Sequence, residues 1–289
     1  YEGDTIASAL IANGIHLVGR SFKYHRPRGF FGAGVEEPNA KLQVEFNGHS
    51  EPNVNATEME LVEGLSATSQ NCWPSVNFDI GAINNFLKMF FPAGFYYKTF
   101  MWPKSFWYKI YEPFIRKAAG LGVASIEKDK ERYEHKFEYC DLLVTGSGPS
   151  GLASAYAAAK NGAKVILAED KPRFGGTLLT DDVSIDNLSG KDWAEKIITE
   201  LKSMPNVTVK NRSQVFGYYD HNMLVMFERV SDHLEKKSKF TPRQRLWYIR
   251  AKETILSTGS IERPIVFGNN DTPGIFLSAA AKEYMKVYG

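Results

Sequence analysis

Three glycines, Gly146, Gly148 and Gly151, form a G-x-G-x-x-G pattern directly after the apolar run 142–144. The Ala-rich run 152–160, directly after the third glycine, predicts a helix. In such a turn the first glycine permits a sharp bend, the second lets a pyrophosphate approach the backbone, and the third lets the helix lie close to the strand. Because the N–H groups and the macrodipole at a helix start attract negative charge, the pattern predicts a dinucleotide-binding turn.

An acidic residue follows the second apolar strand, which we expect over residues 165–168. Glu169 stands about twenty residues beyond the glycines, the distance at which a carboxylate takes the ribose hydroxyls of a dinucleotide. Together these elements are more specific than the glycines alone; the alternative is a glycine-rich turn that binds nothing. No arginine stands where a 2′-phosphate needs one, which favours NAD or FAD over NADP, although Lys171 and Arg173 follow closely.

A second glycine-containing loop covers residues 173–178. Gly175 and Gly176 allow a close backbone pass, and the hydroxyl of Thr177 can reach a pyrophosphate. The sequence therefore predicts a second loop beside the first glycine turn.

The remaining strands of this half predict a Rossmann-like α/β sheet. Residues 207–209 and 254–258 are expected to extend the sheet, and residues 224–229 and 245–250 alternate like strands of an antiparallel insertion. The last strand of the sheet ends in a Ser-Thr-Gly turn.

The composition is that of an ordinary globular protein, with 43% apolar and 24% charged residues in 289, enough for two domains. The formal net charge of +2 argues against a general nucleic-acid or membrane-surface binder. The two cysteines, Cys72 and Cys140, have no CxxC or His-rich surroundings, so neither a disulfide nor a metal site is expected. Two reduced thiols in a cytoplasmic protein fit this pattern better.

Residues 1–50 have the pattern of a small α/β module that contains the basic and aromatic run 20–29. Three interpretations of this run stay open: a solvated loop, an anion site or a contact with a partner chain. Farther along, aromatic side chains crowd into residues 86–114, where Lys and Pro interrupt every run long enough to span a membrane. Either short helices pack on the main domain, or this surface is buried against another subunit, which we favour.

Two runs at the ends of the chain resemble one family. Residues 3–40 and 259–289 are similar to the alpha subunit of heterotetrameric sarcosine oxidases, and the glycine fingerprint between them fits as well. The first run resembles a domain related to [2Fe-2S] ferredoxin domains of amine and opine dehydrogenases. Cluster cysteines would fall in residues 30–35, which contain none, so we expect no iron–sulfur cluster.

For the fold, the resemblance implies a Rossmann-like α/β domain of the two-dinucleotide-domain flavoprotein type, preceded by a small ferredoxin-like α+β domain. We expect the ferredoxin-like domain over residues 1–75, an aromatic-rich helical connection over 76–137 and an incomplete FAD/NAD-binding domain over 138–289. We also expect the chain to be a fragment, because it begins without Met and stops directly after an expected helix.

For function, the resemblance implies an oxidoreductase complex of alpha, beta, gamma and delta subunits. In this family the beta subunit carries FAD and oxidises the methylamine, FMN lies near the alpha–beta interface, and the alpha subunit holds NAD. A C-terminal domain that is absent here passes formaldehyde to tetrahydrofolate. The fragment alone is therefore expected to turn nothing over.

The motif and the resemblance together predict one set of dinucleotide contacts. These are Gly146, Gly148, Ser150, Gly151, Glu169, Asp170, Lys171, Gly176, Thr177, Val215, Thr258 and Gly259. No catalytic residue and no metal ligand is predicted, because the six histidines are scattered and match no motif. The alternatives are a self-sufficient FAD-dependent, pyridine-nucleotide-linked reductase and a scaffold subunit with an empty nucleotide fold.

Overall fold

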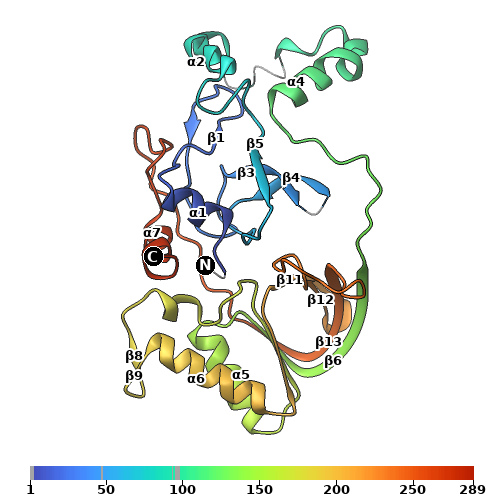
Figure 1. Ribbon diagram of the computed structural model, residues 1–289, viewed down its shortest axis with the longest axis vertical. Helices are drawn as coiled ribbons and strands as arrows, with labels where there is room; N and C mark the ends of the chain where they lie inside the picture. Colours follow the sequence, from blue (N-terminus) through green and yellow to red (C-terminus); the bar gives the residue numbers. More distant parts are fainter. Residues whose placement is uncertain (1–2, 47, 93, 95–97) are drawn as a thin grey trace. The chain divides into compact units, whose positions relative to one another are not determined.

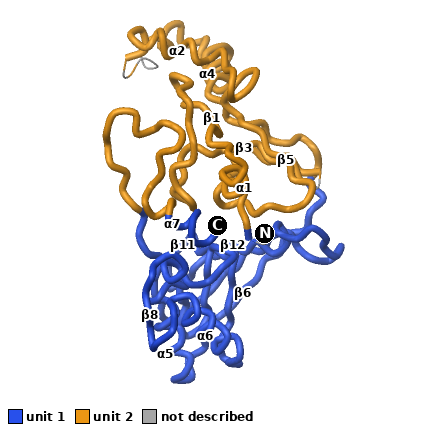
Figure 2. Tube along the Cα trace, turned by 60° about the vertical axis from the view of Figure 1, so that its left-hand side comes forward, with its two compact units in different colours: residues 1–3, 129–261, 282–289 blue, residues 4–128, 262–281 orange. Residues whose placement is uncertain are grey.

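The computed structural model describes residues 3–46, 48–92, 94 and 98–289, and the chain divides into two compact units. One unit consists of residues 129–261 and 282–289 with Gly3, and the other of residues 4–128 and 262–281 (Figure 2).

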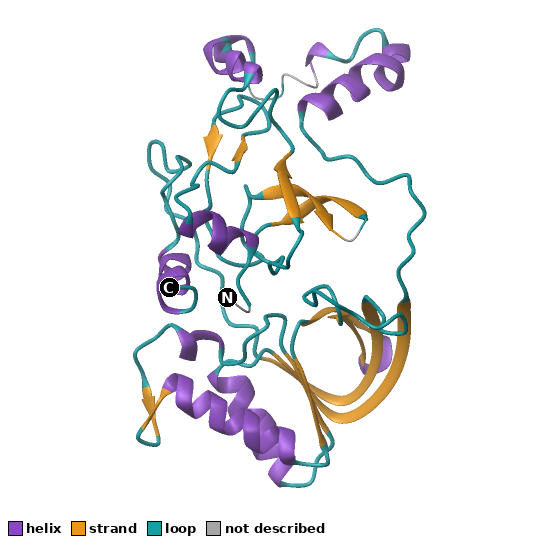
Figure 3. Ribbon diagram, in the orientation of Figure 1, coloured by secondary structure: helices purple, strands orange, loops and turns teal. Residues whose placement is uncertain are grey.

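The first unit is built on a six-stranded sheet of order β10-β7-β6-β13-β12-β11 (Figures 1 and 3). Its strands are β6 (Tyr133–Thr145), β7 (Val165–Ala168), β10 (Val207–Lys210), β11 (Ser213–Tyr219), β12 (Met223–Arg229) and β13 (Gln244–Leu256). The strands β10, β7, β6 and β13 are parallel, whereas β12 and β11 are antiparallel additions. This mixed α/β sheet confirms the expected fold class.

Two helices cover one face of this sheet, α5 (Pro149–Lys160) and α6 (Gly190–Ser203). The helix α5 starts with proline at its first position and ends at Asn161 and Gly162, while the side chain of Ser189 caps α6. Buried residues of both helices pack on β6 and β7 in one apolar core: Leu142, Val144, Leu152, Ala155, Val165, Leu167, Trp193, Ile197, Ile198 and Leu201. The opposite sheet face has its own core of Cys140, Leu143, Ile166, Ala168, Leu224, Met226, Ile249 and Ala251. Burial on both faces is what short parallel strands require.

Shorter elements complete this unit: the 3-10 turn η5 (Gly176–Leu179), the strands β8 (Ser184–Ile185) and β9 (Leu188–Ser189), and the turn η6 (Asp220–Asn222). The end of helix α7 (Ser278–Lys286) joins it through ion pairs of Lys282 with Asp181 and of Lys286 with Asp182.

The N-terminal part of the second unit is a small α+β module, as expected. It contains α1 (Ile6–Ala12), a two-stranded ladder of β1 (Gly19–Arg20) and β2 (Pro27–Arg28), and a three-stranded antiparallel sheet of β3 (Lys41–Phe46), β4 (His49–Asn55) and β5 (Ser66–Ser69). Thr5 caps the start of α1: its hydroxyl accepts from the N–H of Ser8, and the hydroxyl of Ser8 accepts from the N–H of Thr5.

The basic run in this unit binds carbonyl and carboxylate oxygens of the same unit. Arg20 donates to the carbonyls of Val76 and His25, and Lys23 donates to the carbonyl of Pro92. Arg26 forms a 2.9 Å ion pair with Asp271, which also pairs with Arg28. These contacts favour a structural role for the run over an anion site.

The aromatic-rich connection consists of short helical turns. They are η1 (Ile80–Ala82), α2 (Ile83–Phe86), η2 (Lys88–Phe90), η3 (Lys104–Phe106), η4 (Trp107–Tyr111) and α4 (Glu112–Ala118). None of these described elements contains a buried residue, and Phe86, Met89, Phe90, Trp102 and Tyr108 are each more than 75% exposed. Phe95, Tyr96 and Tyr97, which belong to the crowded aromatic run, lie outside the described residues. Among the residues that the structure describes, no helix is long and apolar enough to cross a membrane.

Candidate functional site

The glycine turn lies at the carboxyl ends of β6, β7 and β13. The N–H of Gly146 donates to the carbonyl of Ala168 over 2.8 Å, and the N–H of Ser257 donates to the carbonyl of Thr145 over 2.7 Å. A ligand crevice is expected at this edge of an open parallel sheet, where the strand order changes direction.

Two of the three motif glycines are required by backbone packing. A Cβ on Gly146, which has φ of +95°, would lie 2.3 Å from the carbonyl oxygen of Ser257. A Cβ on Gly151 would lie 1.9 Å from the carbonyl oxygen of Gly146, so α5 can approach the turn only without a side chain there. Gly148 differs, because nothing lies within 4 Å of its Cβ position. The open space is therefore at the glycine that a pyrophosphate would approach.

The second glycine loop lies against this turn. The N–H of Gly175 donates a 3.1 Å hydrogen bond to the hydroxyl of Ser147, and a Cβ on Gly176 would lie 3.1 Å from the Cα of Gly148. Thr177 follows with an exposed side chain at the start of η5. The structure thus brings Gly146, Gly148, Gly176 and Thr177 together, as a shared site requires.

Glu169 closes one side of the turn and is 6% exposed. Its carboxylate accepts hydrogen bonds from the N–H of Ser147 at 2.9 Å, from the hydroxyl of Ser147, and from the N–H of Lys171 at 3.1 Å. Burial, together with the neighbouring Asp170, raises the pKa of Glu169 to about 7, against the opposing effect of the hydrogen bonds from Ser147 and Lys171. The acid therefore titrates near neutral pH, next to the glycine turn.

The next two residues are held by partners of the same unit. The carbonyl of Asp170 accepts a 2.7 Å hydrogen bond from Arg229, and the ammonium of Lys171 lies 2.5 Å from the carboxylate of Glu283. Burial acts to lower the pKa of Lys171, but the ion pair with Glu283 outweighs it and raises that pKa. Lys171 is therefore charged and already paired within the protein.

The remaining predicted contacts come from β11 and from the turn after β13. Val215 lies at an irregularity in the pairing of β11 with β12, two residues beyond Ser213, whose N–H donates to the carbonyl of Glu169 over 2.7 Å. The Cα of Thr258 lies 3.5 Å from the Cβ position of Gly146, and both Thr258 and Gly259 are exposed. Ser150 is exposed in the first turn of α5. All of the predicted contacts thus belong to one unit.

Ser147 is the site residue that sequence reasoning missed. It is fully buried, donates to Glu169 from both its N–H and its hydroxyl, and accepts from Gly175. In the sequence, the feature that could have pointed to Ser147 is its place between the first two glycines of the motif, as a small residue with a hydroxyl group. Two residues before Ser147, the hydroxyl of Thr145 is buried without a hydrogen-bond partner.

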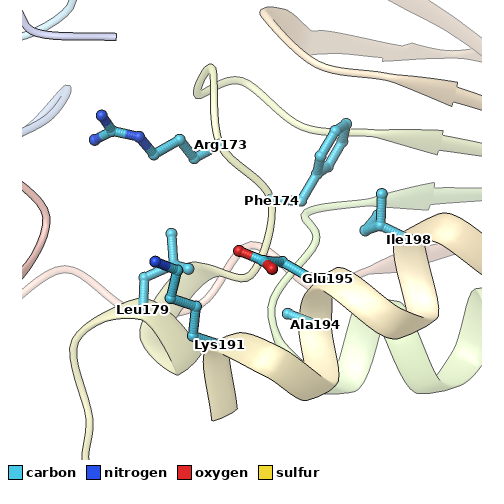
Figure 4. Close-up of a pocket in the computed structure, with 7 residues that line it drawn as sticks. All are labelled: Arg173, Phe174, Leu179, Lys191, Ala194, Glu195 and Ile198. Carbon is cyan, nitrogen blue, oxygen red and sulfur yellow. The ribbon is translucent and has the colours of Figure 1, made fainter. Parts of the chain in front are cut away.

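A separate cavity of about 340 Å³ lies beside α6 and the second glycine loop, residues 173–178 (Figure 4). It is lined by Arg173, Phe174, Leu179, Lys191, Ala194, Glu195 and Ile198. It contains none of the predicted dinucleotide contacts, so it is distinct from the glycine crevice.

Other chemistry-bearing side chains have structural surroundings. His25 and Asp79 form a buried pair with 2.6 Å between Nδ1 and Oδ2. Burial raises the pKa of the Cys140 thiol to about 12 and also raises the pKa of Cys72, so neither is an activated nucleophile. In the described ranges no three His, Cys, Asp or Glu side chains are grouped as a metal site.

Two known families match parts of the chain. Residues 1–72 match the 2Fe-2S iron-sulfur cluster binding domain, and residues 141–227 match the FAD dependent oxidoreductase family. The second match contains the glycine turn and the acid described above.

Known relatives match the whole chain or about half of it. The alpha subunit of sarcosine oxidase from Rhizobium meliloti (strain 1021) is 54% identical over 100% of this chain and 29% of its own length. The protein of the same name from Corynebacterium sp. (strain U-96) is 34% identical over 100% of this chain and 26% of its own length. An opine oxidase subunit from Agrobacterium tumefaciens (strain Ach5) is 27% identical over 53% of this chain and 30% of its own length. The chain spans less than a third of the length of these relatives.

Among solved structures, L-proline dehydrogenase from P. horikoshii superposes with a TM-score of 0.60 over 99% of this chain and 44% of that chain. At 19% sequence identity this likeness concerns the fold alone. It agrees with the expected flavoprotein-type α/β fold preceded by a small ferredoxin-like module.

Proposed function

This chain is a homologue of sarcosine oxidase alpha subunits along its whole length, and from that premise we propose that it binds NAD between its two glycine loops. The observation that supports this most is the meeting of three features at one sheet edge. The turn at Gly148 is open, the loop at Gly176 lies against it, and the carboxylate of Glu169 borders both through Ser147.

In this proposal the pyrophosphate lies at the start of α5. No side chain of the described residues caps the first turn of α5, so its N–H groups and the positive end of the helix dipole remain for an anion. Exposed hydroxyls of Ser150 and Thr177 add donors, and the turn at Thr258 and Gly259 borders the same glycines. The geometry thus suits a diphosphate more than a single carboxylate ligand.

The ribose and the adenine belong, in this proposal, to the side of Glu169. A carboxylate accepts ~four hydrogen bonds, and Ser147 and Lys171 supply three of them here. In this proposal a ribose hydroxyl competes for the remaining position with the side chain of Asp170, which also hydrogen-bonds to Glu169. Asp170, Lys171 and Val215 would form the adenine side.

FAD is the second candidate for this crevice, because residues 141–227 match the FAD dependent oxidoreductase family. Both cofactors share the ADP half that the glycine loops and Glu169 would hold. Mass spectrometry of the nucleotide released from the purified multisubunit protein decides between them. Release of NAD supports the proposal, whereas FAD retained by the alpha subunit itself favours a flavin-dependent reductase.

At the level of the whole protein, we propose a heterotetramer with beta, gamma and delta subunits in the cytoplasm. The partner carries FAD and shares FMN, the complex oxidatively demethylates sarcosine, and a part of the alpha subunit beyond these residues passes formaldehyde to tetrahydrofolate. The names of the relatives support a multisubunit sarcosine oxidase. Within it, we assign residues 1–75, 76–137 and 138–289 as ferredoxin-like domain, connection and nucleotide domain. These 289 residues would bind and organise, with no turnover of their own.

A scaffold subunit with an empty nucleotide fold is excluded or supported by a melting experiment. A ligand that binds only the native state at a hundred times its Kd stabilises it by ~2.7 kcal/mol. We expect millimolar NAD to raise the Tm of the protein, and AMP alone to raise it less. No shift with NAD, FAD or AMP would support the scaffold.

We also propose that the exposed aromatic connection is where another subunit docks. Its exposed apolar side chains, including Phe86, Trp102 and Phe114, are too many for scattered surface residues. The cations around them, Lys88, Lys104, Lys109 and Lys117, are exposed, whereas the one carboxylate between residues 80 and 118, Glu112, pairs with Arg116. This charge pattern fits a partner subunit with an apolar face rimmed by acidic residues.

Copurification tests this docking surface in the co-expressed complex. We expect Trp102→Ser with Phe114→Ser to release the partner subunits, whereas Phe240→Ser, at an equally exposed position of the other unit, leaves the complex intact. An intact complex with the double variant contradicts the proposal. The proposal is also contradicted if the unmodified protein binds vesicles of anionic lipid instead of partner subunits, and the double variant loses that binding.

A further inference from the structure

The carboxylate of Glu37 lies inside the loop of residues 30–40 and is bonded to its backbone. One oxygen accepts from the N–H groups of Phe31 at 2.6 Å and Gly32 at 2.8 Å. The other accepts from the N–H groups of Asn39 at 2.6 Å and Ala40 at 3.2 Å. Glu37 is only 2% exposed, so this ring of amides surrounds a buried negative charge.

Glu36 fills the rest of the same loop. Its Oε1 accepts from the N–H groups of Ala33 at 2.7 Å and Gly34 at 3.0 Å. A Cβ on Gly32 would lie 2.6 Å from that oxygen, and a Cβ on Gly34 would lie 2.9 Å from the other oxygen. Gly32 and Gly34 therefore leave room for the carboxylate of Glu36.

The match of residues 1–72 to a 2Fe-2S cluster binding domain raises the question whether this loop fits a cluster. Iron–sulfur clusters are held by Cys thiolates, with His replacing two of them in some centres. Residues 1–72 contain one cysteine, Cys72, and the loop of residues 30–40 contains neither cysteine nor histidine. Because carboxylates already occupy six of its amides, the residues present do not fit the cluster.

We propose that Glu36 and Glu37 take the place of an anionic cluster and convert this loop into a rigid anchor for residues 262–281. The anchor has three contacts within one unit. The N–H of Leu277 donates to the carbonyl of Phe31 over 2.8 Å, and a Cβ on Gly29 would lie 2.8 Å from the Cα of Pro273. Asp271 pairs with Arg26.

The carbonyl of Phe31 and its N–H belong to the same short segment, so the bond to Glu37 also fixes the acceptor of Leu277. Residues 262–281 begin three residues beyond Gly259 in the chain. The loop thus anchors the segment that follows the Ser-Thr-Gly turn at Gly259, and no electron transfer through this domain is required for that role.

Hydrogen exchange on the full-length protein tests the anchor. Glu37→Gln keeps the shape but puts an NH₂ group where a backbone N–H needs an acceptor. One pair of amides, 31 and 32 or 39 and 40, then loses its acceptor, so the loop should open as a unit. We expect exchange at all four amides to become at least ~tenfold faster, together with faster exchange at Leu277. Glu45→Gln, an exposed change on β3, is the matched control and should leave both regions unchanged.

Faster exchange at the loop without any change at Leu277 would overturn the anchor role, and unchanged exchange at the loop would overturn the carboxylate lock. Glu36→Gln repeats the measurement at amides 33 and 34 if the Glu37 variant does not fold. Anaerobic incubation of the protein with ferrous iron and sulfide tests separately whether it binds a cluster. We expect no visible cluster absorption and no bound iron, and two irons per chain would overturn the proposal.

Discussion

The N–H of Ser147, between the first two glycines of the turn, donates a 2.9 Å hydrogen bond to the carboxylate of Glu169. The hydroxyl of the same serine donates to Glu169 and accepts from Gly175, so one buried side chain connects both glycine loops and the acid. This arrangement holds the crevice in shape by contacts of the protein alone.

Gly148 and Gly151 should respond in opposite ways to the same added methyl group. Gly148 has φ of −65° and open space around its Cβ position, so Gly148→Ala should change the free energy of unfolding by less than ~0.5 kcal/mol. A methyl group there lies where a pyrophosphate would approach, so NAD affinity should fall at least ~tenfold, or ~1.4 kcal/mol. Calorimetric titration and thermal melting measure both quantities.

Gly151→Ala is the matched comparison, because its Cβ would lie 1.9 Å from the carbonyl oxygen of Gly146. The helix start must move, and we expect a loss of ~2–3 kcal/mol in stability even without ligand. Equal affinities for NAD in the Gly148 variant and the unmodified protein would place the ligand elsewhere.

The raised pKa of Glu169 predicts how nucleotide binding depends on pH. A carboxylate accepts from ribose hydroxyls best when it is ionised, and this pKa is about 7 in the folded protein. We therefore expect affinity for NAD to fall as pH is lowered from 8 to 6. Glu169→Gln should bind more weakly at pH 8 and lose this dependence. A profile that is unchanged in the variant contradicts the assignment.

The same pKa predicts the pH dependence of stability without ligand. The folded value of about 7 is above the ordinary value of 4.5, so the folded state holds this proton more tightly than the unfolded state. Stability from this group is present below pH ~4.5 and is lost as pH rises through 7, by an amount of order 3 kcal/mol. Urea unfolding at intervals between pH 5 and 8 should show that decline, and Glu169→Gln should flatten it.

The sequence was sufficient for the glycine turn because all of its determinants are local. Gly146, Gly148 and Gly151 stand at fixed spacing between a strand and a helix, and Glu169 follows the next strand. The part that Ser147 plays could not be read in the same way, because a serine in a turn is also compatible with a solvated side chain.

Local sequence patterns could not predict the contacts between segments that lie far apart in the chain. The run that contains Arg26 and Arg28 was compatible with a solvated loop, an anion site or a partner chain, whereas Asp271, which pairs with both arginines, stands more than 240 positions later in the chain. Likewise, the sequence shows that residues 30–35 contain no cysteine, but not that the side chain of Glu36 lies against Gly32 and Gly34.

Asp271 should therefore stabilise the unit of residues 4–128 and 262–281. Asp271→Asn removes the charge that pairs with both Arg26 and Arg28 while keeping the size of the side chain. The pair with Arg26 is partly exposed, so we expect a loss of only ~1–2 kcal/mol in the free energy of unfolding. Asp220→Asn, at an exposed position of the other unit, is the control and should have no effect in the same denaturant titration.

The two cysteines should differ in their reaction with a thiol reagent. Cys140 is 0% exposed, and burial raises its pKa to about 12, so almost no thiolate is present or accessible at pH 8. Cys72 is half-buried with a raised pKa, and should react slowly in the folded protein. Mass spectrometry after brief treatment with iodoacetamide should find label at Cys72 first, and at Cys140 only after unfolding in guanidinium chloride. Rapid labelling of Cys140 in the folded protein would show that β6 opens, and would contradict the tight core on that face of the sheet.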